Sequence, residues 1–266
     1  MRFKNTEVYG FKSALRGMRN PMNSWDKSDS GICKGGDSGL GCSNCSENKK
    51  CYHEYDNEFK LGKNDMKLAQ HLIRAGSEHR KFMRQIFVSV DITAPLYWWK
   101  EFDTYKVGTV ANSTSTMHKL ATTPITLECF EIDDYDDSIT EYKRDGGVYP
   151  MQSVFVEFLE HIRQKYLGTG DKRYWKELIR WLPESWLQTR TVTMSYENLL
   201  AMCSKEQRRF HKLNEWSGQD DNTKPNFISW ARTLPYAQEL IFIDEVEEDT
   251  YDYCFTRGFR IREVHN

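Results

Sequence analysis

Residues 84 to 93 (RQIFVSVDIT) constrain the fold most strongly, because they carry the alternating pattern of a β-strand. Apolar residues recur at every second position, and a period of two is typical of a strand with one buried face. These apolar residues are Ile86, Val88, Val90 and Ile92. Pro95 ends the strand or begins the next helix, since proline has no backbone N–H to donate. We expect a helix at 96 to 106, with an apolar side formed by Leu96, Trp98, Trp99 and Phe102.

The rest of the chain predicts a mixed order of strands and helices. Residues 6 to 19 fit a strand or turn and then a short helix that ends near Asn20-Pro21. Helical spacing predicts further helices at 65 to 75, 151 to 167, 171 to 181, 193 to 210, and 226 to 241 with an interruption at Pro235. The fold class is therefore α/β (α+β), with a helical C-terminal half.

Length and composition predict a single domain over residues 1 to 266. A chain of 266 residues with 39% apolar residues can bury one substantial core. The stretch from about 24 to 64 is rich in Gly, Ser, Asp, Lys and Cys, which indicates an inserted loop. We expect a second, acidic surface loop at about 128 to 147.

The charge balance and hydropathy exclude some partners. With 37 basic and 39 acidic residues the net charge is close to zero, which argues against nucleic-acid binding through a broad positive face. No window approaches 18 consecutive apolar residues, so no membrane partner is expected. The N-terminal residues MRFKNTEVYG lack the apolar core of a signal peptide, and we expect a cytoplasmic protein. No Walker-type loop, G-x-S-x-G or G-x-G-x-x-G supports a hydrolase or nucleotide triphosphatase.

Seven cysteines make a disulfide framework improbable, because the number is odd and three of the cysteines are scattered. The other four lie in the polar loop with the spacing C-x8-C-x2-C-x5-C, and they are Cys33, Cys42, Cys45 and Cys51. Four thiolates can bind Zn²⁺ tetrahedrally and stabilise such a loop. The alternative is a flexible insertion with incidental cysteines.

A run of hydroxyl and amide side chains follows the aromatic helix. Its members are Asn112, Ser113, Thr114, Ser115 and Thr116. Their side chains and successive backbone amides can donate to a phosphate without any arginine. The alternative is that they cap a helix and complete a turn, as Ser, Thr and Asn usually do.

Residues 88 to 120 (VSVDITAPLYWWKEFDTYKVGTVANSTSTMHKL) resemble the signature region of the flavin-dependent thymidylate synthases. In that family a strand runs into Ala-Pro, an amphipathic helix, the triplet Arg-His-Arg, seven further residues and a Ser. Here Ala94-Pro95 match, Thr104-Tyr105-Lys106 occupy the triplet, and Thr114 occupies the Ser position. Sparser similarities extend the resemblance to about residues 6 to 241: Ala14-x-Arg16, Asp65-x-x-Leu68 before Gly76, Leu182-Pro183, Thr193-x-Ser195, and QRRFHKLNEW.

The resemblance implies a central antiparallel or mixed sheet flanked by helices, and it implies roles for individual residues. Catalytic positions are Glu101, Tyr105 and Lys106. Positions that hold FAD are His79, Thr104, Tyr105, Lys106, Ser195, Glu197 and His211. Positions that hold the substrate are Glu101, the run Asn112, Ser113, Thr114, Ser115 and Thr116, and the arginines Arg180, Arg208 and Arg209.

Some of these residues have simpler explanations. Arg208 and Arg209 can be a solvated basic cluster at a helix C-terminus, where the helix dipole favours positive charge. His79 can be structural or exposed. Trp98 and Trp99 can fill the core and a subunit contact or, alternatively, stack on flavin.

The implied activity is transfer of a one-carbon unit from methylenetetrahydrofolate to C5 of dUMP or a related pyrimidine nucleotide, with FAD and with NADPH as reductant. The family also implies a homotetramer. The chain departs from the family where Thr104 replaces a guanidinium, which removes bidentate phosphate recognition. Two alternatives follow: a homologue that binds nucleotide or flavin without thymidylate synthesis, as a sensor or interaction protein, or an enzyme for a different pyrimidine nucleotide.

Overall fold

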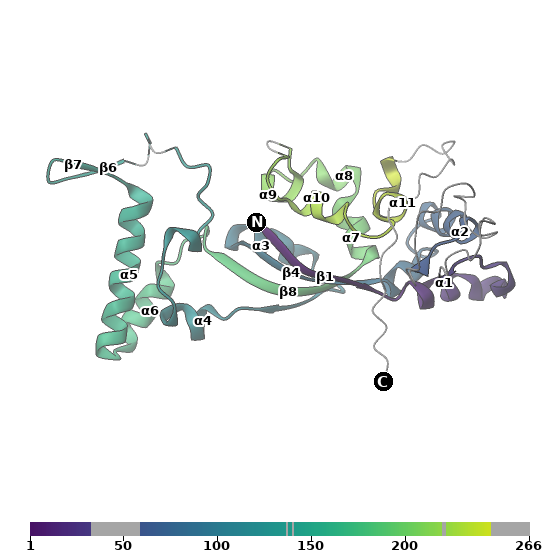
Figure 1. Ribbon diagram of the computed structural model, residues 1–266, viewed down its shortest axis with the longest axis horizontal. Coiled ribbons are helices and arrows are strands. Elements are labelled where there is room, and N and C mark those ends of the chain that lie inside the picture. Colours follow the sequence, from purple (N-terminus) through teal and green to yellow (C-terminus); the bar gives the residue numbers. More distant parts are fainter. Residues whose placement is uncertain (33–58, 137, 140, 220–221, 246–266) are drawn as a thin grey trace, which may run out of the picture. The chain divides into compact units, whose positions relative to one another are not determined.

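The computed structural model describes residues 1–32, 59–136, 138–139, 141–219 and 222–245 (Figure 1). These residues form two compact units, each containing helices. Unit 1 comprises Met1–Lys4, Asp91–Lys106 and Ala111–Thr191. Unit 2 comprises the described residues of Asn5–Val90, Val107–Val110 and Val192–Asn266. The four loop cysteines, Cys33, Cys42, Cys45 and Cys51, lie outside the described residues, so the zinc hypothesis stays a prediction.

A four-stranded sheet with the order β1-β4-β8-β5 is the main β-structure of the described chain. Its strands are β1 (Arg2–Tyr9), β4 (Phe87–Pro95), β8 (Leu187–Ser195) and β5 (Val110–Ser113). In β4 the buried residues alternate, and they are Val88, Val90, Ile92 and Ala94. The predicted strand is thus confirmed, although it begins three residues later because a 3₁₀ turn, η3 (Lys81–Gln85), precedes it.

The predicted helix at 193 to 210 was wrong at its start. Residues 193 to 195 end strand β8, and only α7 (Tyr196–Cys203) and α8 (Lys205–Arg208) are helical. The sequence LQTRTVTMS is rich in β-branched residues, which favour an extended backbone. Ser204 then separates α7 from α8 with a backbone conformation outside the helical region, and its hydroxyl caps α8. The C-terminal half therefore contributes a strand to the main sheet as well as helices.

Unit 1 contains a pair of helices, α5 (Met151–Thr169) and α6 (Lys172–Arg180), that lie side by side (Figure 1). An antiparallel hairpin of β6 (Glu141–Arg144) and β7 (Gly147–Pro150) leads into α5. Between and around these elements lies an apolar cluster of Leu120, Ile125, Phe130, Leu159, Ile162 and Leu178. The shorter elements of the unit are α3 (Leu96–Phe102), η4 (Asp103–Tyr105), α4 (Thr116–Lys119), η5 (Leu120–Thr122) and η6 (Leu127–Cys129).

Phe11 is buried in unit 2 against two tyrosine rings. The Phe11 ring lies 5.5 Å from the ring of Tyr196 and 5.8 Å from that of Tyr236. Gly10 directly precedes helix α1, which begins at Phe11, and has φ +92°. A Cβ there would lie 2.0 Å from the carbonyl oxygen of Gln85, so only glycine fits. The elements of the unit are α1 (Phe11–Arg19), η1 (Asn20–Met22), η2 (Trp25–Lys27), β2 (Gly31–Ile32), β3 (Phe59–Lys60), α2 (Lys63–Arg74), η3, α7, α8, α9 (Asn214–Ser217), α10 (Phe227–Ala231), α11 (Ala237–Leu240) and η7 (Ile243–Glu245).

The helices predicted from spacing at 65 to 75, 151 to 167 and 171 to 181 are confirmed as α2, α5 and α6. The interruption expected at Pro235 separates α10 from α11.

Candidate functional site

The aromatic helix α3 fixes the turn that follows it. Trp98 and Trp99 are buried, with rings 4.9 Å apart and nearly perpendicular, and the Phe102 ring stacks on Trp98 at 5.2 Å. Both tryptophans therefore belong to the core, as expected. Such contacts hold the end of α3 rigidly, since packed rings have little rotamer freedom. Turn η4 (Asp103–Tyr105) begins directly after this anchored end.

Turn η4 and Lys106 carry the residues that replace the Arg-His-Arg triplet. Thr104 is exposed, and its hydroxyl donates to the Glu101 carbonyl oxygen at 2.7 Å. Lys106 is exposed and forms no ion pair within the described ranges. Glu101 and Tyr105 are half-buried. The turn thus presents one hydroxyl and one ammonium group to solvent.

The hydroxyl run lies on the edge strand β5 and the turn after it. Asn112, Ser113 and Thr114 are exposed, and no hydrogen bond joins their side chains to the part of the chain that the structure describes. Ser115 and Thr116 are half-buried, and the Ser115 hydroxyl accepts the His118 backbone N–H at 3.1 Å as the N-cap of α4. The capping alternative therefore holds for Ser115. The side chains of residues 112 to 114 are available to a ligand.

A partly buried relay of side chains connects the hydroxyl run to η4. Arg190 Nη1 donates to Asp103 Oδ1 at 2.9 Å, and Arg190 Nε donates to Gln188 Oε1 at 3.0 Å. Gln188 Nε2 in turn donates to the carbonyl oxygen of Thr114 at 3.1 Å. The Arg190 guanidinium also lies over the Trp99 ring, 4.2 Å from its centre. Neither Arg190 nor Gln188 was predicted as a site residue.

Arg180 ends helix α6 and is exposed. The same helix is attached to the residue after the hydroxyl run, because Trp175 Nε1 donates to the Met117 carbonyl oxygen at 3.0 Å. Unit 1 therefore holds α6, the hydroxyl run and η4 through hydrogen bonds within one compact body.

The predicted flavin residues of unit 2 make contacts inside the chain. Ser195 caps α7 and forms a capping box with Asn198. The Glu197 carboxylate accepts from Arg80 Nε at 3.0 and 3.1 Å. His79 is exposed in the turn directly before Arg80, and its backbone N–H donates to the Gly76 carbonyl oxygen at 3.0 Å.

The basic segment after α7 divides into buried and exposed parts. His211 is 3% exposed and stacks on Trp216 with ring centres 4.2 Å apart. Arg209 is exposed, forms a 3.6 Å ion pair with Glu206 and lies over the Phe210 ring. Arg208 is the last residue of α8, and its side chain is not among the described ones.

These residues fit an anionic dinucleotide in part. Lys106 offers an exposed positive charge, whereas the Thr104 hydroxyl already donates to the Glu101 carbonyl oxygen and can only accept from a ligand. Ser195 and Glu197 do not fit, because the hydroxyl already serves as a cap and the carboxylate would repel a pyrophosphate. The fit of FAD to this chain therefore depends on the turn at 104 to 106.

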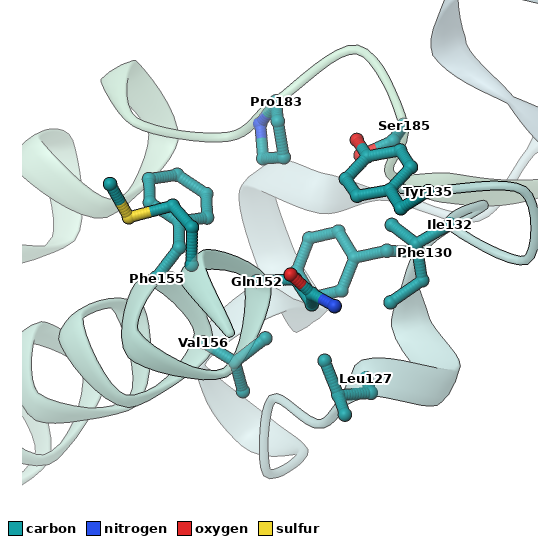
Figure 2. Close-up of a pocket in the computed structure, with 10 residues that line it drawn as sticks. Leu127, Phe130, Ile132, Tyr135, Gln152, Phe155, Val156, Pro183 and Ser185 are labelled. Atoms are coloured by element: carbon teal, nitrogen blue, oxygen red, sulfur yellow. The ribbon is translucent and has the colours of Figure 1, made fainter. Parts of the chain in front are cut away.

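An apolar pocket of about 300 Å³ lies elsewhere in unit 1 (Figure 2). Figure 2 shows the Gln152 amide among apolar side chains, and none of the predicted site residues lines the cavity. The lining residues are Leu127, Phe130, Ile132, Tyr135, Met151, Gln152, Phe155, Val156, Pro183 and Ser185. This cavity borders the apolar core of the unit, and its wall holds no charged residue.

The described residues contain no group of three His, Cys, Asp or Glu side chains placed to hold a metal ion. Cys129 and Cys203 are free thiols. Within the same ranges, no helix is long and apolar enough to cross a membrane.

Comparison with known proteins identifies the fold. No protein-family model and no curated protein matches the chain. Two structures of flavin-dependent thymidylate synthase ThyX from Helicobacter pylori, each with FAD and dUMP, match with a TM-score of 0.52. Their identities are 12% and 13%; the matches cover 93% and 92% of this chain and 100% and 98% of theirs. The UMP/dUMP methylase PolB from Streptomyces cacaoi, bound with 5-Br dUMP, matches at TM-score 0.42 and 15% identity over 67% of this chain and 80% of its own. The chain thus has an α/β fold like that of the flavin-dependent thymidylate synthases.

Proposed function

We propose that this protein binds a pyrimidine nucleotide and transfers a one-carbon unit to C5 of dUMP or a related pyrimidine, with FAD as cofactor. The supporting observation is that the exposed run 112 to 114 and the turn 104 to 106 are held together in one unit of a fold like that of the thymidylate synthases. The resemblance assigns the turn 104 to 106 to flavin binding and the hydroxyl run to nucleotide binding. Methylenetetrahydrofolate and NADPH are the expected co-substrates, and a cytoplasmic homotetramer is the expected assembly.

The hydroxyl run supports phosphate binding by neutral donors. Its three exposed side chains offer two hydroxyls and one amide, each of which can donate to a phosphate oxygen. Neutral donors bind an anion less strongly than a guanidinium does, so we expect a cation to complete the site, either Arg180 of the same unit or Arg208 or Arg209 of another subunit in the expected homotetramer.

Glu101, near the end of α3, and Lys106, in the turn that follows, support binding and activation of the base. The Glu101 carboxylate can accept the N3–H of a uracil ring, which would fix the orientation of the ring. Lys106 places positive charge on the exposed side of the turn, where it can stabilise negative charge that develops on a pyrimidine oxygen. When bound, reduced FAD supplies the reducing equivalents of the transfer.

A second candidate function is nucleotide binding without synthesis, in a sensor or interaction protein. The contacts of Ser195 and Glu197 favour it, because both positions that the resemblance assigns to flavin are engaged within unit 2. A third candidate keeps the chemistry but changes the pyrimidine, with Glu101 and Tyr105 in contact with a different base.

Two measurements separate these candidates. The purified protein should show the visible absorption of a flavin, or should gain thermal stability when FAD is added. In deuterated buffer, dUMP should exchange its C5 hydrogen in the presence of the protein. Thermal stabilisation by dUMP with neither flavin binding nor exchange would support the nucleotide-binding candidate, whereas a different nucleotide that exchanges in place of dUMP would support the third.

A further inference from the structure

Arg190 occupies the centre of a hydrogen-bonded chain within unit 1. Its side chain is 16% exposed, and its guanidinium uses Nη1 for Asp103, Nε for Gln188 and its face for Trp99. Arginine can make these three contacts at once because its donors are fixed in a planar fork. A lysine in the same place has a single nitrogen and cannot reproduce this geometry.

This series of hydrogen bonds links the two segments of the proposed site, the turn 104 to 106 and the hydroxyl run. Asp103 directly precedes Thr104, so its bond to Arg190 fixes the start of the turn 104 to 106. Gln188 holds the Thr114 carbonyl oxygen, and the Thr114 N–H donates to the Thr189 carbonyl at 2.9 Å. A displacement of Arg190 would therefore move both segments.

The backbone around Gln188 adds a second constraint. Trp99 Nε1 donates to the Gln188 carbonyl oxygen at 3.0 Å, so the aromatic helix and strand β8 are joined at the residue that also holds Thr114. The network is partly buried, since Gln188 is buried and the Asp103 side chain is 48% exposed, and removal of Arg190 leaves Gln188 Oε1 without this donor.

From this geometry we infer that Arg190 is a positioning residue of the nucleotide site, which sets the turn 104 to 106 and the hydroxyl run at a fixed separation through Asp103 and Gln188. The functional part of this inference rests on the proposed nucleotide binding. The mechanical part does not, because it concerns the free protein.

Hydrogen exchange of the free protein tests the mechanical part. Arg190→Met should raise exchange about tenfold in peptides that contain 103–106 and in those that contain 113–115. Asp103→Asn should raise it only at 103–106, and Gln188→Leu only at 113–115. As a control, Lys100→Met removes the exposed ion pair to Glu184 in the same unit and should change neither segment. An increase at only one segment, or at neither, in Arg190→Met would overturn the inference.

Nucleotide affinity tests the functional part. Arg190→Met should weaken dUMP binding about tenfold, Arg190→Lys should restore little of it, and Lys100→Met should bind as the wild type does. Equal dUMP affinity in Arg190→Met and the wild type would refute a positioning role. If the wild type binds no dUMP, the proposed function fails, while the exchange pattern still decides whether the relay couples the two segments. Arg190→Lys also serves for the exchange experiment if Arg190→Met does not fold.

Discussion

Replacement of Glu160 by glutamine tests the interior of unit 1 quantitatively. Glu160 Oε1 accepts from Arg163 Nη2 at 2.6 Å, and Oε2 accepts from Arg163 Nε at 2.7 Å and from the Ile125 N–H at 2.9 Å. The Arg163 side chain is only 6% exposed, so the cost of burying its charge is offset by the interaction with the Glu160 carboxylate. These hydrogen bonds, chiefly those from Arg163, lower the pKa of Glu160 from 4.5 to about 2.

The magnitude follows from this pKa difference. Each pKa unit corresponds to about 1.4 kcal/mol, so the difference of about 2.5 units sets an upper bound of about 3.5 kcal/mol. Since the Glu160 side chain is 27% exposed, solvent screens part of the interaction, and we expect about 1 to 2 kcal/mol at pH 7. The pKa is lower in the folded state, so this contribution is complete above the unfolded pKa of 4.5 and is lost as the pH falls toward 2.

Urea unfolding at pH 7 and at pH 3 measures the effect. Glu160→Gln should lower the free energy of unfolding by about 1 to 2 kcal/mol at pH 7 and by less than half of that at pH 3. Glu157→Gln, at an exposed position on the same helix, should change it by less than about 0.5 kcal/mol at either pH. The reasoning is refuted if the two variants lower the free energy of unfolding equally at pH 7, or if the loss in Glu160→Gln does not depend on pH.

Three further predictions concern a glycine, a core tryptophan and a metal. Gly10→Ala should lower the free energy of unfolding by about 2 kcal/mol or more, because its Cβ would collide with a backbone carbonyl oxygen. Gly76→Ala, also at positive φ but with open space around it, should lower it by about 1 kcal/mol, and a smaller loss for Gly10→Ala than for Gly76→Ala in thermal unfolding would contradict the prediction. Trp98→Ala should lower the free energy of unfolding in denaturant by about 3 to 5 kcal/mol, because Trp98 is buried. Trp181 is half exposed, so Trp181→Ala should lower it much less, and equal losses would argue against a core position for Trp98. Metal analysis of protein made without an affinity tag should find about one zinc per chain if the cysteines between 33 and 51 bind it, and a content near zero rejects that hypothesis.

Local patterns predicted most of the fold. The alternation in 84 to 93 identified β4, because each of its apolar residues faces the core at a period of two. Helical spacing identified α2, α5 and α6 for the corresponding reason. Strand β8 was missed, because its residues 193 to 195 run directly into the helical pattern of α7, and a spacing argument has no marker between them except the cap at Ser195.

The candidate site was less predictable, because its contacts join residues that are distant in sequence. Arg190 meets Asp103 across 87 positions, and Gln188 meets Thr114 across 74. No local period encodes such a pair. The β-branched residues around Arg190 would have indicated a strand, but they do not indicate which residue that strand faces. The resemblance likewise gave a position for Glu197 but not its partner Arg80.

The central claim is that the exposed hydroxyl run binds a pyrimidine nucleotide, and the melting temperature with and without dUMP tests it most directly. At a dUMP concentration of about 100 times Kd, the wild type should gain about 2.7 kcal/mol of stability. The double variant Ser113→Ala/Thr114→Ala should lose most of this gain, and Ser185→Ala should keep it. The claim is contradicted if all three proteins gain equally, or if dUMP leaves the melting temperature of the wild type unchanged.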